Sequence, residues 1–529
     1  MRLVLHDSGV GTLGIQYLLA IAKAHGHDAR LFFDNSFSKD YLAQDFFLTN
    51  FLSLTPQQAC DRITALEPEV VGFSMYSYLY KGHMKLIRLL KRANPELVII
   101  CGGTHPSLLP EVVLRNEEVD FVIVGEAELS FPAFLEALAN SGTSQVKALP
   151  REALPGVWNM HEGAVVERGL SPIVRDLDQV VFPEKEAHYE ANPALSSIYT
   201  LVTSRGCFNA CTYCNSSSLN VLYRSHHERY YRARSVDNVM AELRMATTKY
   251  HPRYIEFFDD AFGAKRSWLR EFCTRYKEEI GLPYDVQTIP TVLDEESLEW
   301  LADSGCVDLE VGFQAANPQV RANVLNRHET NEEVKSLVLR AIELGMFVEL
   351  DLIVNLPGET REHIEESLEF IRETRPQLVS VGFLQYFPKT PIIDIAIREG
   401  VISPAHIRKI EQGEFMNSMR LLSQSGLGTR YRIIPFQMFF ASRMPRWISR
   451  PLIRLVEKPL IRNVCSFCAS AFLYASRLLI SFTDKRDFYL RGQIIRSFYA
   501  AKWVLARKFS GTSRERALVA QSSRQTPQG

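Results

Sequence analysis

Three cysteines within eight residues constrain this chain more than any other feature of its sequence. They have the spacing Cys207-x-x-x-Cys211-x-x-Cys214. One short loop thus offers three thiolates, whereas a cubane iron–sulfur cluster takes four ligands, so one iron would stay open to a small molecule. A structural zinc site would normally bring a fourth Cys or His at short spacing. The next histidines, His226 and His227, lie twelve and thirteen positions past Cys214. The spacing favours an iron–sulfur site, with zinc or an inert role as the alternative.

Five short apolar runs alternate with helical patterns over the first 140 residues. The runs cover residues 2–6, 29–33, 70–74, 97–101 and 121–124, and they are typical of buried parallel strands. The segments between them have helix periodicity, as in residues 13–24, which are followed by Gly26 where a helix would stop. The pattern predicts a doubly wound, flavodoxin-like α/β domain with a ligand crevice at the carboxyl ends of its strands.

Small residues stand where two of these strands end. Ser74 follows the third strand, and Gly102 and Gly103 follow the fourth. Glycine lets the backbone approach a ligand closely, and a serine hydroxyl can bond to it. Ordinary turn residues of a sheet are the alternative interpretation.

From residue 198 onward, a strand pattern followed by a helix pattern recurs six times. The strands lie near residues 198–203, 253–258, 284–289, 307–313, 347–354 and 378–384. Six such units predict a partial, open (β/α)6 barrel. An open barrel suits a site that must admit a bulky substrate and a second cofactor over its carboxyl-terminal face.

The cysteine run, with Tyr213 just before its last cysteine, resembles the signature of the radical SAM enzymes. The resemblance implies a [4Fe-4S] cluster held by Cys207, Cys211 and Cys214. It also implies that the open iron chelates S-adenosylmethionine, which one electron from the cluster cleaves to a 5′-deoxyadenosyl radical. The cofactor carries the hard chemistry, and the protein supplies burial and orientation.

The first 140 residues resemble the cobalamin-binding domain that precedes the barrel in a large radical SAM subfamily. The resemblance lies in residues 67–74 (EPEVVGFS) and 119–128 (VDFVIVGEAE). It implies that Ser74, Gly102 and Gly103 approach the nucleotide tail of cobalamin. Mutase-type domains carry Asp-x-His after the first strand, but no His stands two residues after Asp7. Cobalamin is therefore expected to bind with its own base displaced and without a protein His on cobalt. His6 and His105 are nearby alternatives, and a structural role is favoured for both.

Candidate contacts to S-adenosylmethionine follow the second, fourth and fifth barrel strands. Residues 257–262 (FFDDAF) resemble the family's segment that contacts the methionine end of S-adenosylmethionine. Asp259 or Asp260 would then pair with the ammonium group of this molecule. Alternatively, one of the two aspartates could cap the helix beginning near Ser267. Where many relatives carry a Glu after the fourth strand, this chain has a Gln. The family's Gly-Leu-Pro-Gly-Glu-Thr is matched by residues 355–360 (NLPGET). The remaining expected cofactor contacts are Gly312, Gln314, Asn355, Pro357 and Gly358.

Four further residues of the barrel are noteworthy. Arg327 matches a basic position of relatives, or it is a solvated surface residue. Lys389 occupies a glycine position of the family's Pro-x-Pro-Gly-Thr-Pro, which puts the local turn in question. Cys273 and Cys306 are expected to be buried apolar residues and not ligands.

The charge of the chain is strongly asymmetric. Residues 404–529 hold 22 Lys+Arg and 6 Asp+Glu, which gives a net charge of +16. The whole chain has 60 Lys+Arg and 61 Asp+Glu, so residues 1–403 hold 38 Lys+Arg and 55 Asp+Glu, a net charge of −17. An apolar stretch of 14 residues between Arg462 and Arg477 is shorter than the roughly 18–20 residues that cross a bilayer. Basic and apolar residues alternate around it, which is typical both of an interfacial helix on anionic lipid and of a helical cap on the barrel. RNA is a less favoured partner, because no RNA-binding fold is recognisable. Cys465 and Cys468 favour helix packing over an auxiliary cluster.

These patterns divide the chain into five parts. They are a cobalamin-binding domain (1–140), a proline-rich connector with a hairpin-like patch at 156–166 (141–195), the partial barrel (196–400), a basic helical domain (401–510) and a polar, disordered tail (511–529). The nine cysteines are odd in number and unevenly spaced, and no secretory leader is recognisable. We therefore expect a reducing cytoplasm, with peripheral contact at the inner face of a membrane as an option.

The resemblance implies a cobalamin-dependent radical SAM enzyme, and we expect a methyltransferase that acts on an unactivated carbon of a small molecule. A hydrophobic substrate is suggested only by the apolar, basic tail. A flavodoxin or ferredoxin would supply the electron. No carboxylate stands out as a general base, and hydrogen abstraction by a radical requires none. The alternatives are a cyclase or oxidative rearrangement enzyme with the same cofactors, and a redox sensor whose tail binds membrane or RNA.

Overall fold

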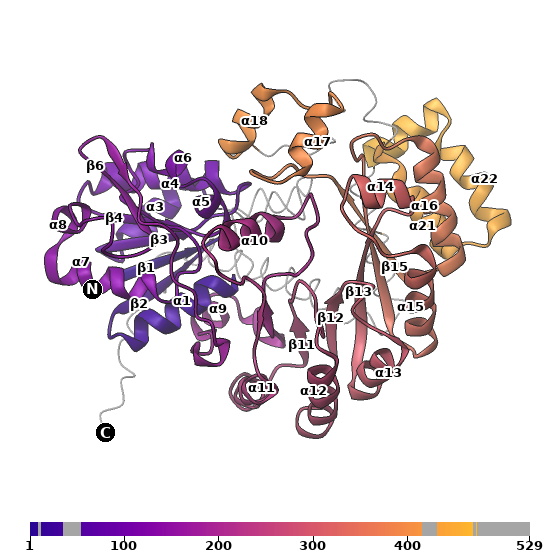
Figure 1. The fold of residues 1–529 in the computed structure, drawn as a ribbon, viewed down its shortest axis with the longest axis horizontal. Helices are drawn as coiled ribbons and strands as arrows, with labels where there is room; N and C mark the ends of the chain where they lie inside the picture. Colours follow the sequence, from indigo (N-terminus) through magenta and orange to yellow (C-terminus); the bar gives the residue numbers. More distant parts are fainter. Residues whose placement is uncertain (9–11, 35–53, 415–430, 469–471, 473–474, 476–529) are drawn as a thin grey trace.

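The first part of the computed structural model is a seven-stranded sheet with helices on both faces (Figure 1). The structure describes residues 1–8, 12–34, 54–414, 431–468, 472 and 475. The strand order is β2-β1-β3-β4-β5-β6-β7, and the first five strands are parallel, as the doubly wound prediction requires. These strands are β1 (Arg2–Asp7), β2 (Asp28–Phe33), β3 (Val70–Ser74), β4 (Val98–Gly102) and β5 (Phe121–Ile123).

The helices of this part bury apolar stripes on the two faces of the sheet. In α1 (Leu13–Ala24), Ile15, Leu19 and Ala22 recur at helical spacing and pack against one face. The same face receives α7 (Ser130–Ser141) and α8 (Thr143–Lys147). The other face is covered by α3 (Pro56–Thr64), α4 (Tyr80–Ala93) and α6 (Pro110–Leu114), while the short α5 (Thr104–Leu108) begins at the end of β4.

The expected connector contributes to this sheet. Its hairpin, β6 (Val157–His161) and β7 (Ala164–Val166), is antiparallel and pairs with β5 through Phe121 and Asn159. The rest of the segment forms η2 (Leu177–Gln179), α9 (Glu186–Ala191) and η3 (Pro193–Ser197). The sequence indicated the hairpin but not its attachment to the sheet, and the five domain limits stay predictions.

The second sheet has the six parallel strands that the barrel prediction places there. They run in the order β15-β14-β13-β12-β11-β8, and β8 and β15 are the two edges, so the barrel is open. The strands are β8 (Ile198–Leu201), β11 (Tyr254–Phe257), β12 (Tyr284–Thr288), β13 (Cys306–Gln314), β14 (Phe347–Val354) and β15 (Leu378–Phe383). A two-stranded sheet, β9 (Ser204–Arg205) and β10 (Arg232–Ala233), lies beside it.

Helices pack against the outer face of the second sheet. In β13, Leu309, Val311 and Phe313 pack into the helix-covered core, whereas Asp308 and Glu310 alternate onto the concave face. Burial raises the pKa of Glu310, and negative charge on Asp351 and Glu349 of β14 raises it further. The helices that contribute to this core are α11 (Val236–Tyr250), α12 (Arg266–Glu279), α13 (Glu295–Ser304), α15 (Asn331–Glu343) and α16 (Arg361–Thr374), whereas α10 (Asn215–Ser225) and α14 (Pro318–Asn323) lie outside it.

The described part of the basic C-terminal region is helical, as expected. It comprises α18 (Pro404–Glu411), α21 (Ile434–Arg443) and α22 (Arg446–Val456), and α17 (Ile392–Arg398) precedes it. Ile434, Met438 and Ile453 join the core of the second sheet, while Trp447 is 76% exposed. Among the described residues, no helix has both the length and the apolarity that a membrane span requires. The apolar stretch after Arg462 lies only partly within the described residues, and the tail after Ser510 lies outside them.

Candidate functional site

The chain just before the cluster loop, residues 207–214, is held by hydrogen bonds to the buried carboxylate of Asp259. Asp259, which follows β11 and is 1% exposed, accepts hydrogen bonds from the backbone N–H of Thr203 (2.9 and 3.1 Å) and from the hydroxyls of Thr203 (2.9 Å) and Ser204 (2.5 Å). Burial raises the pKa of this carboxyl, and these bonds oppose the rise. Both oxygens are engaged by the chain, so Asp259 positions the approach to Cys207, and a contact to S-adenosylmethionine is better assigned to its neighbour.

The rest of the cluster loop is tied down by backbone and amide groups from distant segments. The N–H of Thr212 donates to the carbonyl of Leu325 (3.1 Å), and the carbonyl of Thr212 accepts from the N–H of Ile392 (3.0 Å). The Asn326 side chain donates to the Ala210 carbonyl (2.8 Å), and that of Asn220 to the Cys207 carbonyl (3.2 Å). Hydrogen bonds from other segments of the chain therefore hold the loop.

The three thiols of the loop fit a cluster. Cys207 and Cys211 are buried, Cys214 is half-buried, and the N–H of Asn209 points at the sulfur of Cys207 (3.4 Å). Burial is the main cause that raises the pKa of Cys207 to about 12; the Asn209 N–H opposes it, and charge on Asp260 and the other two cysteines adds to it. Ligation to iron would replace these protons. Three thiolates from one loop leave one iron of a cubane open to a small molecule, so this donor set fits a cluster.

Arg327 is a buried residue of the site, so its interpretation as a solvated surface residue is wrong. It is 5% exposed, and its guanidinium donates to Glu329 (2.7 Å) and to the carbonyl of Gly312 (2.6 Å). It also lies beside the cluster loop, where its charge opposes the effect of burial on the pKa of Cys211. Arg327 thus connects the end of β13 with a candidate cluster ligand.

Two candidate contacts to S-adenosylmethionine occupy left-handed backbone positions. Gln314 has φ +71° at the irregular end of β13, and Asn355 has φ +62° directly after β14. Asn is among the residues that tolerate this region best, which explains how it replaces the family's glycine. Lys389, which occupies a glycine position of the family's motif, also adopts a positive φ (+62°). The backbone conformation that glycine favours is therefore present at this position.

Glu359 folds the loop after β14 onto itself, and it should make stability depend on pH. It accepts hydrogen bonds from the N–H groups of Asn355 (2.5 Å) and Leu356 (3.3 Å). Burial raises its pKa to about 8, although these bonds oppose the rise. A carboxyl whose pKa is raised by folding stabilises the fold fully below its ordinary value, and that contribution is lost as pH rises through 8.

Glu359→Gln, which keeps the acceptor oxygen, should therefore remove part of the pH dependence of unfolding. We expect the wild type to lose about 3 kcal/mol more than the variant between pH 5.5 and 8.5. Urea unfolding at the two pH values measures the difference. Glu362→Gln is the matched control, because Glu362 is exposed and its pKa is lowered. Equal pH slopes in wild type and Glu359→Gln would contradict the expectation.

Asp260 lies next to the cluster loop. It is exposed to solvent although protein surrounds it on most sides, and its carboxylate accepts from the hydroxyl of Ser216 (2.7 Å), in the first turn of α10. Burial within the site raises its pKa. The expected cap on the helix near Ser267 is not made, because α12 has Lys265 at its N-cap without a side-chain bond. Accessibility makes Asp260 the better of the two candidates for an ammonium group.

The glycines at the end of β4 make a close approach within the first sheet. Gly103 has φ +96°, and a Cβ there would lie 2.9 Å from the N of Met75 and 3.2 Å from the hydroxyl of Ser74. At Gly102 a Cβ would meet nothing closer than 4.0 Å, so this position is open. Ser74, Gly102 and Gly103 are thus brought together at the carboxyl edge of the sheet, where ligands of this fold bind.

The histidines near this edge are engaged inside the protein. His105 is fully buried and its Nδ1 lies 3.0 Å from the hydroxyl of Ser77; burial lowers its pKa to about 4. His6 is also buried, at 1% exposure. The end of β1 holds a pair that the sequence did not reveal, because Asp7 bonds to His188 of α9 (2.7 Å) as well as to Thr12. These contacts agree with structural roles.

Comparison with known proteins decides the family. The model of the B12 binding domain matches residues 8–135, and that of the Radical SAM superfamily matches residues 201–371. The chain is a cobalamin-binding radical SAM protein. It is therefore a cobalamin-dependent radical SAM enzyme, and its cofactors are cobalamin, S-adenosylmethionine and the iron–sulfur cluster of its family.

The relatives of this radical SAM enzyme include methyltransferases and cyclases. It is 22% identical to "Uncharacterized methyltransferase PH0819" of Pyrococcus horikoshii, over 75% of this chain and 81% of the relative. It is 25% identical to the cytidylyl-2-hydroxyethylphosphonate methyltransferase of Streptomyces wedmorensis (74% and 79%). It is 24% identical to the anaerobic magnesium-protoporphyrin IX monomethyl ester cyclase of Rubrivivax gelatinosus (71% and 64%).

Solved structures of the same kind share the fold. The cobalamin-dependent S-adenosylmethionine radical enzyme OxsB superposes with a TM-score of 0.63 at 14% identity, covering 99% of this chain and 81% of OxsB. The methyltransferase TsrM from Kitasatospora setae, solved with tryptophan and a SAM analogue, gives 0.58 at 17% identity (75% and 76%).

Proposed function

We propose that this enzyme transfers a methyl group from S-adenosylmethionine to an unactivated carbon of a small molecule. The observation that carries the proposal is the cobalamin domain joined to a radical SAM barrel in a chain whose relatives at 22% and 25% identity, over three quarters of its length, are named methyltransferases. One S-adenosylmethionine would supply the 5′-deoxyadenosyl radical, and cobalamin would carry the methyl group of another. The chain's own residues orient these groups and exclude water.

We assign three sets of residues to the cofactors. Cys207, Cys211 and Cys214 would hold a [4Fe-4S] cluster, since their loop is shaped and half-enclosed by the protein. Asp260 would take the ammonium group of S-adenosylmethionine, because its carboxylate is accessible beside Cys214. The loops after β13 and β14 would hold the rest of this molecule through Gly312, Gln314, Asn355, Pro357 and Gly358.

Cobalamin would bind at Ser74, Gly102 and Gly103 without a protein imidazole on cobalt. The support is that both neighbouring histidines, His6 and His105, are buried in the sheet domain. Asp7, which corresponds to the aspartate of mutase-type domains, is used to hold His188 and Thr12. Cobalamin would then bind with its own base displaced and with neither His6 nor His105 in its place.

Two further functions remain as alternatives. A cyclase with the same cofactors is favoured by the 24% identity to the Rubrivivax gelatinosus cyclase. A redox sensor would use the cluster without cleaving S-adenosylmethionine and would bind membrane or RNA through its tail. Contact of the exposed Trp447 face with an anionic membrane, a flavodoxin or ferredoxin as electron donor, and a cytoplasmic location stay predictions.

A labelling experiment separates the three functions without knowledge of the substrate. The reconstituted enzyme, with cobalamin bound, is reduced anaerobically and incubated with S-adenosylmethionine that carries a trideuterated methyl group. Methyl transfer predicts S-adenosylhomocysteine, with the label recovered on cobalamin, together with some 5′-deoxyadenosine. Mass spectrometry measures all three. If 5′-deoxyadenosine forms and cobalamin stays unlabelled, the cyclase is favoured. If neither 5′-deoxyadenosine nor labelled cobalamin forms, the redox sensor is favoured.

A further inference from the structure

Both flanks of the cluster loop are attached to a single turn of the cobalamin domain, residues 125–128. The first attachment is ionic. Arg205 stands two residues before Cys207, and its guanidinium pairs with Glu126 (3.2 Å) and Glu128. Arg232 of β10 lies opposite Arg205 of β9. Its guanidinium forms an ion pair with the same Glu126 and donates a hydrogen bond to the Val174 carbonyl (2.7 Å). The four charged side chains are only 8–16% exposed, so solvent screens them weakly.

The second attachment comes from α10, which begins directly after Cys214. The hydroxyl of Tyr223, in the last turn of α10, accepts a hydrogen bond from the N–H of Glu126 (2.8 Å). Gly125 makes this approach feasible, because its φ is +99° and a Cβ there would lie 3.0 Å from the Tyr223 hydroxyl and 2.9 Å from Leu170. Figure 1 shows α10 between the two sheets, and it also contacts α5.

The same turn is bonded to the glycines assigned to cobalamin. The N–H of Gly125 donates to the hydroxyl of Ser107 (2.9 Å), and that hydroxyl donates to the carbonyl of Gly103 (2.8 Å). Ser107 is 5% exposed, so water does not replace these bonds. A continuous series of hydrogen bonds and ion pairs therefore runs from Gly103 through residues 125–128 to both ends of the cluster loop.

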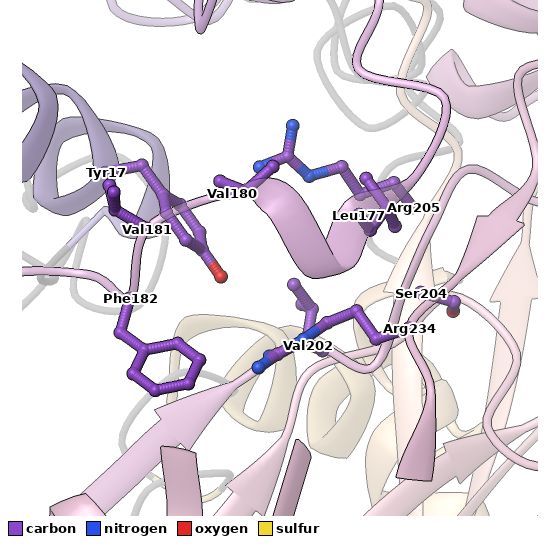
Figure 2. Close-up of a pocket in the computed structure, with 9 residues that line it drawn as sticks. All are labelled: Tyr17, Leu177, Val180, Val181, Phe182, Val202, Ser204, Arg205 and Arg234. Atoms are coloured by element: carbon purple, nitrogen blue, oxygen red, sulfur yellow. The ribbon is translucent and has the colours of Figure 1, made fainter. Parts of the chain in front are cut away.

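The surroundings of Arg205 are closely packed. Its guanidinium lies 5.2 Å from the centre of the Tyr17 ring, which comes from α1 of the cobalamin domain. Figure 2 shows these two residues around a cavity that Arg234 and the segment after η2 also line. The cavity holds only about 10 Å³, room for one water molecule at most. Packing of this density transmits displacements and does not absorb them.

We propose that the turn of residues 125–128 positions the iron–sulfur cluster relative to cobalamin, with Glu126 and Glu128 as positioning residues. The two cofactors meet one substrate, so their separation must be held within a fraction of an ångström. Because one turn grips both flanks of the cluster loop and bonds to Gly103, occupation of the cobalamin site changes the environment of the cluster. The inference rests on the two cofactor domains and not on methyl transfer as the reaction.

The variant Glu126→Gln/Glu128→Gln tests this role. It removes the charges and keeps the side-chain volumes, while the backbone bonds to Tyr223 and Ser107 remain. In the wild type, addition of cobalamin should change the electron paramagnetic resonance spectrum of the reduced cluster. In the variant the cluster should form, but its spectrum should no longer respond to cobalamin.

Two further variants keep the test decisive. Glu136→Gln, on the exposed side of α7, is the matched control and should retain the spectral response. Tyr223→Phe removes only the hydroxyl that Glu126 bonds to, so it should weaken the response even if the double variant fails to fold. A wild-type spectrum indifferent to cobalamin, or a full response in both the double variant and Tyr223→Phe, would overturn the inference. Absent methyl transfer with an intact spectral response would count against the proposed function alone.

Discussion

Replacing Cys211 with alanine should lower the formation of 5′-deoxyadenosine by more than about 100-fold. Even residues that only support metal ligands cost 10- to 100-fold in affinity or activity when they are removed, and a thiolate ligand should cost more. The fold should survive, because the loop is held by the carbonyl of Leu325 and by Asn326 and not by the sulfur. Anaerobic reconstitution followed by iron analysis and product quantification measures the effect.

The matched control for this variant is Cys468→Ala. Cys468 is exposed in the C-terminal region, far along the chain from the cluster loop. Its exposure does not support the helix packing expected for it, and its removal should leave iron content and cleavage unchanged, whereas an auxiliary cluster would lose iron. Full cleavage activity in Cys211→Ala would rule out the cluster assignment.

Replacing Asp259 with alanine should cost about 3 kcal/mol of stability and prevent assembly of the cluster. The variant leaves the N–H of Thr203 and the hydroxyls of Thr203 and Ser204 without their buried acceptor. Hydrogen bonds to a buried charge contribute about 1.5–3 kcal/mol each, and the raised pKa of Asp259 shows that burial offsets part of this gain. Denaturant unfolding of the anaerobic protein, with iron analysis, measures both effects.

Asp260→Ala is the neighbouring control, with the opposite expectation. Asp260 is accessible and makes a single bond to Ser216, so its loss should change stability by no more than about 0.5 kcal/mol and leave iron in place. If it contacts the ammonium group of S-adenosylmethionine, the variant should bind this molecule more weakly. The reverse outcome, a stable Asp259→Ala with weak binding and an unstable Asp260→Ala, would exchange the two roles.

The parts of the fold that the sequence predicted well are those with strong local periodicity. All five parallel strands of the first sheet and all six of the second lie within a few residues of their expected positions, and α1 covers residues 13–24 as expected. A buried parallel strand is apolar on both faces and a covering helix on one, so each is visible in its own window of sequence.

The contacts that organise the site could not be predicted in this way, because their partners are far apart in the chain. Asp7 and His188 are 181 residues apart, and Arg232 and Glu126 are 106 apart. Arg327 offered no local sign that it is buried, and the positive φ of Lys389 is one that a lysine seldom adopts. Glu126 and Glu128 lie in the segment that resembles a cobalamin-binding domain, but their arginine partners, Arg205 and Arg232, come from the other domain.

The cluster loop keeps its shape through bonds that contain no iron, and this bears on how the enzyme ages in air. Oxygen destroys exposed iron–sulfur clusters, yet the carbonyls and amides that hold residues 207–214 are untouched by that reaction. The polypeptide that has lost its cluster therefore keeps the hydrogen bonds that hold the loop of the three cysteines. Repair would require only ferrous iron, sulfide and reductant, without unfolding the chain or synthesising it again.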